Sequence, residues 1–559
     1  MQSLPNPNSS ITLKALTLGV SALVLAACGG GGSSSPAPIA PTPPAPTPTP
    51  PPATPSTVTL SGKATFDRVP FGAQGTGLNF NAIVQEPIRE AVVELLNSAD
   101  SVIATTRTDT NGDYSFTVDS ETSVRVRVRA QMLATSGSEV DTSVLDNTSN
   151  SAPYVLDGSL ASTGTANQTR NLNADSGWTG SDYTQTRAAA PFAILDTIYE
   201  TMEAFRAADP DVDFPRLEVL WSVDNRSVSG NVADGEIGTS SFTTTNGVPT
   251  IRILGDFDTD ADEFDEHVIS HEFGHYFENV LGRSDSLGGQ HSLTARLDPR
   301  VALGEGWGNA LAGFVSGQIY RDSFTRSQSD FQIDLERNAY PVQGWFSEAS
   351  VQSVLYDVMD SASDGPDTIS AGLLPLYDTF IDPDYKDTPV ATTIFAFQDF
   401  LRQQSSVDAS VLDALLDVQD INGRGIDGTG ETNDGGIAGS LPVYRTLTIG
   451  GPAVSFCSVD DAGDFNRLGN RTYFLMDVPT AQSVNIRMER TSSPNDSDPD
   501  YLVFRRGAFT GSGRSGAVNV EVQDIPFEAD TYFLEAYEFL NIDQSDSNDQ
   551  DTCYTIRAQ

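Results

Sequence analysis

Residues 263–283 read EFDEHVISHEFGHYFENVLGR, and this stretch holds three of the four histidines in a chain of 559 residues. Acidic residues suited to a helix start stand at its beginning, and Gly282 stands where a helix C-cap belongs. Apolar residues recur through it at helical spacing, at Phe264, Val268, Ile269, Phe273, Phe277 and Val280. The stretch therefore predicts a helix on which His271 and His275, four residues apart, share one face.

Two histidines placed in this way are suited to a metal ion. Neutral imidazoles at i and i+4 can bind one Zn²⁺ through nitrogens at about 2.1 Å, and Glu272, directly after the first histidine, then lies beside the ion rather than on it. Zinc lowers the pKa of bound water toward about 7, so the pattern predicts hydrolysis of an acyl bond with Glu272 as general base. The alternative is a solvated helix with two structural histidines. We expect His267, one turn earlier, to be a supporting or exposed histidine rather than a ligand.

A second motif follows at residues 302–314, which read ALGEGWGNALAGF and have the pattern of a short apolar helix opened by Glu305. HEFGH followed by GEGWGN resembles the motifs of the gluzincin metallopeptidases. The resemblance is to thermolysin-like enzymes in the broad sense, and the sequence GEGW is similar to that of fungalysin-like enzymes. The resemblance implies that His271, His275 and Glu305 bind one catalytic zinc ion and that Glu272 is the general base.

The chain also departs from the patterns of known families. The metzincin branch is excluded, because Glu278 and Leu281 stand where its extended motif requires a glycine and a histidine. The gluzincin resemblance covers the general architecture of residues 180–440, but Asn309 replaces the aspartate that fungalysin-like enzymes place four residues after the ligand glutamate. An asparagine oxygen still accepts a hydrogen bond from a ligand histidine, but it brings no charge to raise the basicity of the imidazole. We therefore expect weaker zinc binding or a lower rate.

Asp285 and Asp298 are the other candidates for the third zinc ligand, because both lie between the two motifs. They sit in a segment with glycines and a proline, where aspartate commonly forms turns. Glu305 is favoured, because a helix beginning at GEGWGNALAGF places it on the same face as Asn309. One of these two residues can then bind the metal while the other orients a ligand histidine.

Two further parts of a hydrolytic site stay open in the sequence. Families of this kind use a downstream His or Tyr to stabilise the oxyanion, and His291, Tyr340 and Tyr356 are the candidates. The strand TIRILG, residues 250–255, is a candidate edge for an extended substrate.

Strands are predicted on both sides of the metal motifs. Residues 57–155 alternate apolar and polar residues around an Asn-Gly turn, and they resemble the transthyretin-like (carboxypeptidase regulatory-like) modules of exported enzymes. Residues 446–559 alternate in the same way and resemble bacterial pre-peptidase C-terminal domains. Cys457 and Cys553 bracket this second region, and outside the cytoplasm they predict a disulfide between its first and last strands.

The first residues predict export. ALTLGVSALVLAA is an apolar run too short to span a bilayer, and the run ends in LAAC at Cys28. This ending resembles the lipobox of bacterial lipoproteins, which implies a signal peptide over residues 1–28 and a lipid on Cys28 that anchors the chain to a bacterial membrane. An ordinary secretory signal is the alternative. The expected location is the cell envelope, at the outer membrane, or the extracellular space. Residues 29–56, rich in glycine, serine and proline, predict a tether.

The charge of the chain excludes one class of partner. Acidic residues outnumber basic ones 76 to 32, and the net charge of −44 repels nucleic acid and anionic membrane surfaces. A protein or peptide substrate and the lipid anchor are the partners that we expect.

Calcium is a second candidate metal. In DINGRGIDGTGE, residues 420–431, the oxygen donors and glycine of a calcium-binding loop are matched by Asp420, Asn422, Gly425 and Glu431. Arg424, however, stands where such a loop supplies an oxygen ligand. A plain polar turn is the alternative.

Together these patterns predict a multidomain chain. An α+β zincin-like peptidase domain over residues 156–445 is expected between two antiparallel β-sandwich modules, residues 57–155 and 446–559. The expected activity is peptide-bond hydrolysis by an exported zinc endopeptidase. The alternative is a surface adhesion or binding lipoprotein whose zincin domain is weak or inactive, which Asn309 and the two accessory modules make conceivable. The intact Glu272 argues against it.

Overall fold

The computed structural model describes residues 56–133, 141–337, 339–361, 367–492, 497–543 and 551–559. The chain divides into two compact units, Met1–Thr54 and Pro55–Gln559, and every described residue belongs to the second. The predicted signal peptide with Cys28 lies outside the described residues, as does the predicted tether apart from Ser56. Within the described ranges no helix combines the length and the apolar character that a membrane crossing requires.

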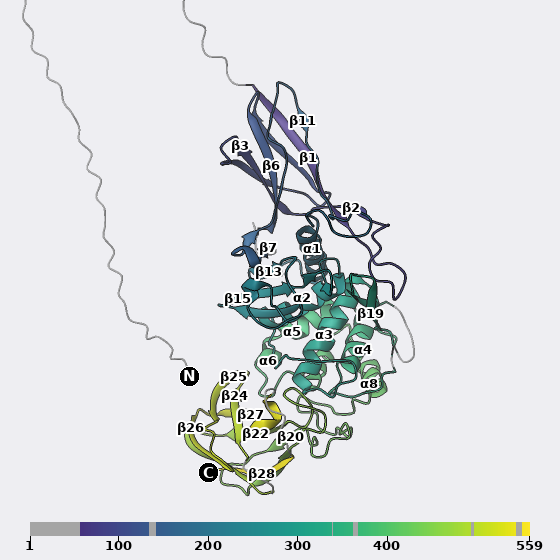
Figure 1. Cartoon of the computed structure of the whole chain (residues 1–559). Coiled ribbons are helices and arrows are strands. Elements are labelled where there is room, and N and C mark those ends of the chain that lie inside the picture. Colours follow the sequence, from purple (N-terminus) through teal and green to yellow (C-terminus); the bar gives the residue numbers. More distant parts are fainter. Residues whose placement is uncertain (1–55, 134–140, 338, 362–366, 493–496, 544–550) are drawn as a thin grey trace, which may run out of the picture. The chain divides into compact units, whose positions relative to one another are not determined.

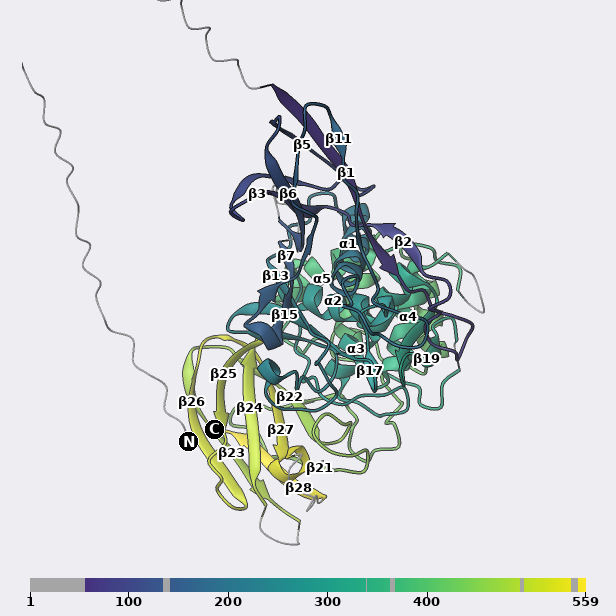
Figure 2. The ribbon, with the colours of Figure 1, turned by 45° about the horizontal axis from the view of Figure 1, so that its top comes forward.

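The first strands of the described chain are built on alternating exposure. In β1 (Thr57–Arg68) every second side chain is buried, and β5 (Asp113–Asp119) and β6 (Ser123–Met132) show the same period of two. β1 pairs with β5 in one sheet, whereas β6 pairs with β3 (Ala91–Asn97) in another, and both pairings are antiparallel (Figures 1 and 2). Buried side chains of both sheets join one hydrophobic core.

Shorter strands complete these two sheets, namely β2 (Val84–Pro87), β4 (Val102–Arg107), β8 (Ala152–Pro153), β9 (Val155–Asp157), β10 (Ala161–Ser162), β11 (Gln168–Thr169) and β12 (Leu172–Ala174).

Sheet pairing crosses the domain boundary predicted at residue 155. β7 (Thr142–Asp146) pairs in parallel with β13 (Leu217–Trp221), β13 pairs in parallel with β15 (Val248–Ile253), and β14 (Ser241–Thr245) pairs with β15 at the end of the sheet. In the other direction β11 and β12 return to pair with β1. The first strands and the middle of the chain are therefore joined by backbone hydrogen bonds.

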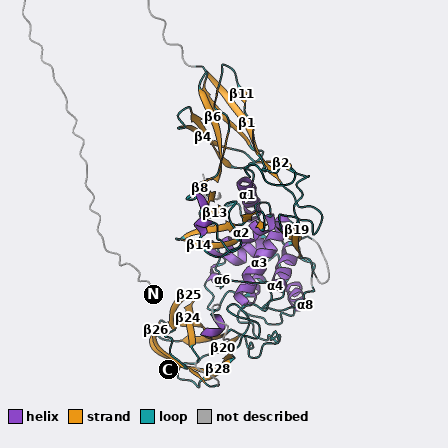
Figure 3. Cartoon of the chain, viewed as in Figure 1, coloured by secondary structure: helices purple, strands orange, loops and turns teal. Residues whose placement is uncertain are grey.

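The α-helices of the described chain all belong to its middle part, and Figure 3 shows most of the helical ribbon gathered there. They are α1 (Ala190–Ala208), α2 (Glu266–Val280), α3 (Pro299–Ser316), α4 (Glu348–Met359), α5 (Leu374–Ile381), α6 (Pro383–Lys386), α7 (Ile394–Leu401) and α8 (Ala409–Val418).

The helix that carries the histidines forms as predicted but begins later than its acidic start suggests. Helix α2 starts at Glu266 with Asp265 as its N-cap, and Asp260–Ala261 form the short strand β17. Its aromatic side chains pack on both neighbours. The Phe277 ring lies 4.5 Å from that of Phe205 in α1 and 5.7 Å from that of Trp307 in α3, centroid to centroid.

A small antiparallel sheet precedes and follows the two central helices in the sequence. It contains β16 (Gly255–Asp256), β17, β18 (Ile319–Phe324) and β19 (Ser329–Asp334), in that order. Pairing of Asp260 with Phe324 brings the segment just before α2 beside the segment that follows α3.

The last strands form two sheets, which Figure 2 shows in yellow and green. One contains β20 (Tyr444–Thr446), β22 (Arg471–Val478), β24 (Pro499–Arg505), β25 (Ala508–Gly513) and β27 (Asp530–Glu538). The other contains β21 (Val454–Ser458), β23 (Gln482–Arg490), β26 (Val520–Phe527) and β28 (Thr552–Ala558). Cys457 in β21 stands opposite Cys553 in β28 and forms a disulfide with it, which confirms the predicted pairing.

A buried ionic network ties the start of α3 to this last region. Arg300 lies 2.9 Å from a carboxylate oxygen of Asp298 and 2.7 Å from one of Glu535 in β27. The Tyr473 hydroxyl also donates to Asp298. These charged side chains are almost fully buried, so each depends on the others for compensation.

Candidate metal centre

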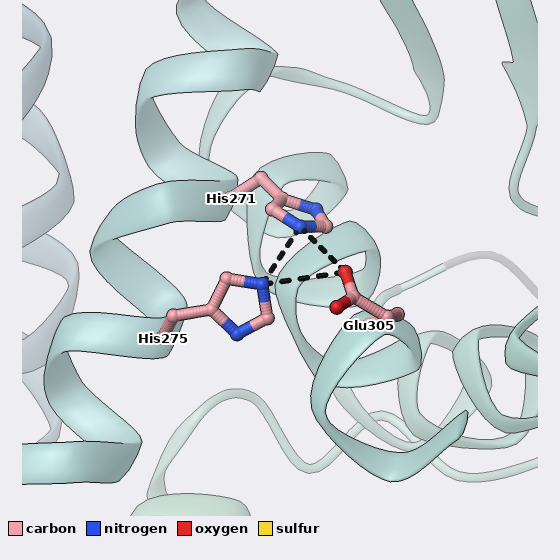
Figure 4. A group of neighbouring side chains, drawn as sticks. All are labelled: His271, His275 and Glu305. Atoms are coloured by element: carbon pink, nitrogen blue, oxygen red, sulfur yellow. Dashed lines mark hydrogen bonds and ion pairs between the residues drawn. The ribbon is translucent and has the colours of Figure 1, made fainter. Parts of the chain in front are cut away.

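His271 and His275 of α2 meet Glu305 of α3 in one cluster (Figure 4). His271 Nε2 lies 3.0 Å from His275 Nε2 and 3.2 Å from Glu305 Oε2. His275 Nε2 lies 3.3 Å from the same carboxylate oxygen. The structure therefore brings together the three residues predicted as zinc ligands.

The spacing of these three donor atoms fits a zinc ion. Ligands at about 2.0–2.1 Å from zinc in a tetrahedron stand about 3.3–3.4 Å from one another. The three distances of 3.0, 3.2 and 3.3 Å lie at or just below that value. Three donors occupy three corners of a tetrahedron, and catalytic zinc sites use the fourth for water or substrate.

The hydrogen bonds around His271 leave its Nε2 as an acceptor. Its Nδ1 lies 3.0 Å from Oδ1 of Asn309, whose amide nitrogen donates to Gln352 Oε1 at 2.9 Å. Because an amide oxygen only accepts, the proton sits on Nδ1, and the lone pair of Nε2 faces the Glu305 carboxylate. Two acceptors in contact repel each other unless a cation lies between them. Asn309 thus occupies the supporting position predicted for it.

Burial and charge oppose each other at the ionisable groups of the cluster. Burial alone would raise the pKa of Glu305, but the facing His275 and His291 hold that pKa well below its usual range. Burial would likewise lower the pKa of His275, and the charge of Glu305 instead raises it to about 9. Glu305 therefore keeps a negative charge in a buried place, where it attracts a cation.

Two glycines allow α2 and α3 to approach each other at the cluster. A Cβ on Gly308 would lie 2.8 Å from the His271 ring, and a Cβ on Gly274 would lie 3.2 Å from the Cα of Gly308. Trp307 adds a hydrogen bond from its Nε1 to the Gly274 carbonyl oxygen at 3.0 Å. The glycines inside the two motifs are therefore required by helix packing, although glycine weakens a helix interior.

A cavity of about 870 Å³ opens beside the cluster and is lined by Glu272 as well as by the three donors. Glu272 is 8% exposed and does not belong to the group of donor atoms identified among the described residues. It therefore lies beside the candidate metal position, as predicted for a general base. The walls come from residues 238–244 and 286–291.

Of the three oxyanion candidates, the structure brings His291 to the cluster. Its Nε2 lies 3.2 Å from Glu305 Oε2, and its Nδ1 lies 2.7 Å from a carboxylate oxygen of Glu348. Tyr340 and Tyr356 are not among the residues that line the cavity. Glu348 was missed by the sequence analysis, because no motif around it marks a role for this first residue of α4.

The two rival third ligands are engaged elsewhere. Asp285 lies 2.7 Å from the Arg283 guanidinium and accepts a hydrogen bond from the Thr392 N–H at 2.9 Å. Asp298 is the N-cap of α3 and pairs with Arg300. Neither joins the donor group found in the described ranges.

The free edge of the sheet that contains β15 lies on β14 and not on residues 250–255, where a substrate edge was predicted. Residues 250–255 overlap β15, which is hydrogen-bonded to β13 on one side and to β14 on the other, so the prediction of a free edge there is wrong. Asn246 and Gly247, both with positive φ, turn the chain back into a hairpin. The open edge therefore belongs to β14, whose residues 241–244 line the cavity.

His267 supports the helix rather than the cluster. It is 5% exposed, and its Nε2 donates to the Gly317 carbonyl oxygen at 2.9 Å. Its ring lies 5.2 Å from that of Tyr320. Burial lowers the pKa of His267 to about 4, so this side chain stays neutral at physiological pH. The supporting role predicted for it fits this environment, whereas the exposed alternative does not.

The calcium-like loop at residues 420–431 closes on itself. The Glu431 carboxylate accepts hydrogen bonds from four backbone N–H groups, at 2.8 to 3.0 Å, those of Asn422, Gly423, Thr432 and Asn433. Arg424 pairs with Asp413 at 2.7 Å. These bonds agree with the polar-turn alternative, and calcium at this loop stays a prediction.

Comparisons with known proteins assign the chain to no family. No protein-family model matches it, and no curated protein matches it. The structure of the pre-peptidase C-terminal domain of a collagenase from Bacillus anthracis is similar to part of this chain, with 9% sequence identity and a TM-score of 0.16. The match covers 21% of this chain and 94% of that domain. The structure of PliG from Aeromonas hydrophila, a periplasmic inhibitor of g-type lysozyme, is also similar, with 10% sequence identity and a TM-score of 0.13. This match covers 21% of the chain and 99% of PliG. Similarities this low carry no argument about fold or function.

Proposed function

We propose that this chain is a zinc-dependent endopeptidase. The observation that carries the proposal is the convergence of His271, His275 and Glu305 beside a cavity that Glu272 also lines. Three nitrogen and oxygen donors with the spacing of a tetrahedron suit zinc, and Asn309 orients one of them from behind. Bound zinc would supply Lewis acidity and lower the pKa of a water molecule toward about 7.

The chain's own residues provide the remaining chemistry. We assign Glu272 the proton of the attacking water and its return to the leaving amine, because this residue lines the cavity together with His271 and His275. His291 is held by Glu348 at 2.7 Å and lines the same cavity. We assign it the hydrogen bond to the oxyanion that forms from the substrate carbonyl.

The substrate is an extended peptide that adds to the edge of β14. Main-chain groups of an edge strand can pair with a second strand, and this edge lies along the cavity wall. Backbone pairing would hold the peptide, and the side chains around the cavity would select its sequence.

A peptide-cleavage assay tests the proposal. Purified protein is incubated with casein or a peptide library, with and without a chelator, and zinc is then added back. We expect cleavage that the chelator stops and zinc restores, and cleavage that is at least about a hundredfold slower in the Glu272→Gln variant with zinc present. Cleavage by that variant at the wild-type rate would contradict the mechanism.

A weak or inactive binding protein is the second candidate, and one observation favours it. His291 Nε2 lies 3.2 Å from the same Glu305 oxygen that faces the two ligand histidines, so a small movement would make it a fourth ligand. A closed, four-ligand site is structural rather than catalytic. In that case His291→Gln would weaken zinc binding as much as His275→Gln does, whereas the peptidase proposal expects zinc to be retained and only the rate to fall.

The surroundings of the enzyme form the last part of the proposal. A lipid on Cys28 would hold the chain in the cell envelope, and the strand-rich regions at both ends would act as the accessory modules that their sequences resemble. Metabolic labelling with a fatty acid tests the anchor, because Cys28→Ser should abolish the label and release the protein from the membrane fraction.

A further inference from the structure

A second group of carboxylates lies in the small sheet next to α2. Asp260 in β17, Asp322 in β18 and Asp262 just before α2 each offer one oxygen, and these oxygens all lie within 4.8 Å of one another. Asp262 is only 3% exposed, and the other two are half-buried. Asp265, the fully buried N-cap of α2, lies close enough to act on the pKa of Asp262.

Each of the three aspartates keeps one enclosed oxygen without a hydrogen-bond partner, namely Oδ1 of Asp260, Asp262 and Asp322. The other oxygen of Asp262, Oδ2, accepts a hydrogen bond from the Ser240 hydroxyl. Only Oδ1 of this buried side chain is therefore without a partner. The carboxyl groups of Asp260 and Asp262 face each other within hydrogen-bonding reach. Buried acceptors in native proteins are nearly always paired, so three unpaired ones at one place indicate a missing partner.

That partner carries positive charge. In the described part of the chain no Lys or Arg forms an ion pair with any of these three aspartates. Burial and the charge of Asp256 raise the pKa of Asp260 to about 6, although a hydrogen bond with Asp262 lowers it. Burial and the charge of Asp260 raise the pKa of Asp322 to about 7. The carboxylates therefore resist ionisation together unless a cation joins them.

We propose that Asp260, Asp262 and Asp322 bind one divalent cation of the calcium class. The donors are all oxygens, which suit hard cations rather than zinc or copper. Calcium bonds of about 2.3–2.6 Å allow donors up to about 5 Å apart and tolerate an irregular arrangement, whereas magnesium demands a near-ideal octahedron. Ligands from two strands and a turn match the more tolerant ion.

The cation would fix one wall of the candidate active-site cavity. Asp262 holds Ser240, and the Ser240 hydroxyl also accepts from the Leu254 N–H at 2.9 Å. Ser240 lines the cavity and immediately precedes β14, the candidate substrate edge. The Asp265 carboxylate accepts a hydrogen bond from the backbone N–H of Ser323, the residue after Asp322, at 2.6 Å. The site thus joins the start of α2, β18 and the beginning of β14 through one ion.

Calcium titration of the zinc-loaded mature protein tests this inference. Isothermal titration calorimetry with CaCl₂ should show one bound equivalent in wild type, and the melting temperature should rise by about 1–3 °C at a tenfold excess of calcium over its Kd. Asp322→Asn should lose both the heat and the shift while it keeps its zinc. MgCl₂ should give a smaller shift in wild type.

Two carboxylates outside the cluster provide controls, one close to it in the chain and one in the calcium-like loop. Asp258→Asn removes a charge from the same hairpin, where Asp258 pairs with Arg326 outside the cluster, and it should keep the calcium shift. Asp420→Asn removes a charge from the calcium-like loop and should also keep it.

Several results would overturn the proposal. One is a wild-type protein that neither binds calcium nor gains stability from it, which is the behaviour expected if the aspartates merely share protons. Another is a calcium shift that Asp420→Asn removes and Asp322→Asn keeps. If Asp322→Asn does not fold, Asp260→Asn takes its place, and the wild-type titration decides in either case. Zinc content is measured alongside, so failure here is distinguished from failure of the peptidase proposal.

Discussion

The histidine–glutamate cluster and the aspartate cluster each combine buried and half-buried side chains, but their polar atoms are satisfied in different ways. His271 is held from behind by Asn309, and Asn309 is held in turn by Gln352. In the other cluster Asp260 and Asp322 each keep an enclosed oxygen that no protein group meets. In the first cluster a histidine is therefore oriented by protein groups, whereas in the second no protein group orients the enclosed oxygens.

This difference predicts opposite responses to metal removal. Loss of zinc should remove activity and leave the surrounding helices folded, because packing and hydrogen bonds hold the ligands in place. Loss of the second cation should lower stability instead, because it leaves like charges buried together. Each experiment below sharpens this contrast or breaks it.

The largest effect is expected from Glu305→Ala, which should remove zinc and hydrolysis together. The matched control is Asp285→Asn, because Asp285 lies between the two motifs but pairs with Arg283. Metal analysis with circular dichroism on folded protein would show the difference. If the aspartate variant lost its zinc while Glu305→Ala kept it, the ligand set would be wrong, although His271 and His275 could still bind a metal.

Glu272→Gln should lower the rate by about 10²–10⁴-fold and keep zinc in place, because the amide preserves size but cannot accept the proton of water. Steady-state kinetics and metal analysis on the same preparation measure both effects. A variant that lost zinc instead would show that Glu272 is a ligand rather than a base.

His267 offers a test on the same helix but away from the metal. Its pKa is lowered by burial to about 4 in the folded protein, whereas an unfolded histidine titrates near about 6.5. The neutral side chain therefore stabilises the fold above pH about 6.5, and this contribution, about 3 kcal/mol, is lost as the pH falls toward 4. Comparing the unfolding free energies of wild type and His267→Gln at pH 7.5 and 4.5 should show a wild-type advantage that shrinks at the lower pH. An equal difference at both values would mean that His267 does not titrate on unfolding.

The smallest effect is expected from Asn309. Removing its amide with Asn309→Ala should weaken zinc binding by about tenfold, because His271 loses the acceptor that fixes its proton. Asn309→Asp is the matched opposite change and should strengthen binding. Competition with a zinc-binding dye measures both, and two unchanged affinities would show that Asn309 does not act on the metal.

The parts of the site that follow from local geometry could be predicted from the sequence. Helix periodicity is enough to place His271 and His275 on one face, and the disulfide between Cys457 and Cys553 follows from two cysteines at the ends of one strand-rich region. Glu305 could be preferred over two aspartates because its helix also presents Asn309. Each of these inferences depends on residues only a few positions apart or on a simple count.

The parts that depend on distant pairing could not be predicted. Asp260 and Asp322 meet because β17 pairs with β18, and no short motif contains both. The free sheet edge is β14 rather than residues 250–255, because a hairpin places one more strand outside them. In residues 420–431, by contrast, a short motif resembles a calcium-binding loop, but the Glu431 carboxylate accepts hydrogen bonds from backbone N–H groups of the loop itself.

The contact between Arg300 and Glu535 determines how this protein can be shortened. A truncation or module exchange that removes the last sheets would leave the Arg300 guanidinium, at the start of the helix that bears Glu305, without one of its two carboxylate partners. The region after residue 446 is therefore better treated by a protein engineer as a part that is interlocked with α3 than as an interchangeable tag. A domain library built for this chain would have to cut elsewhere, or replace both charges at once.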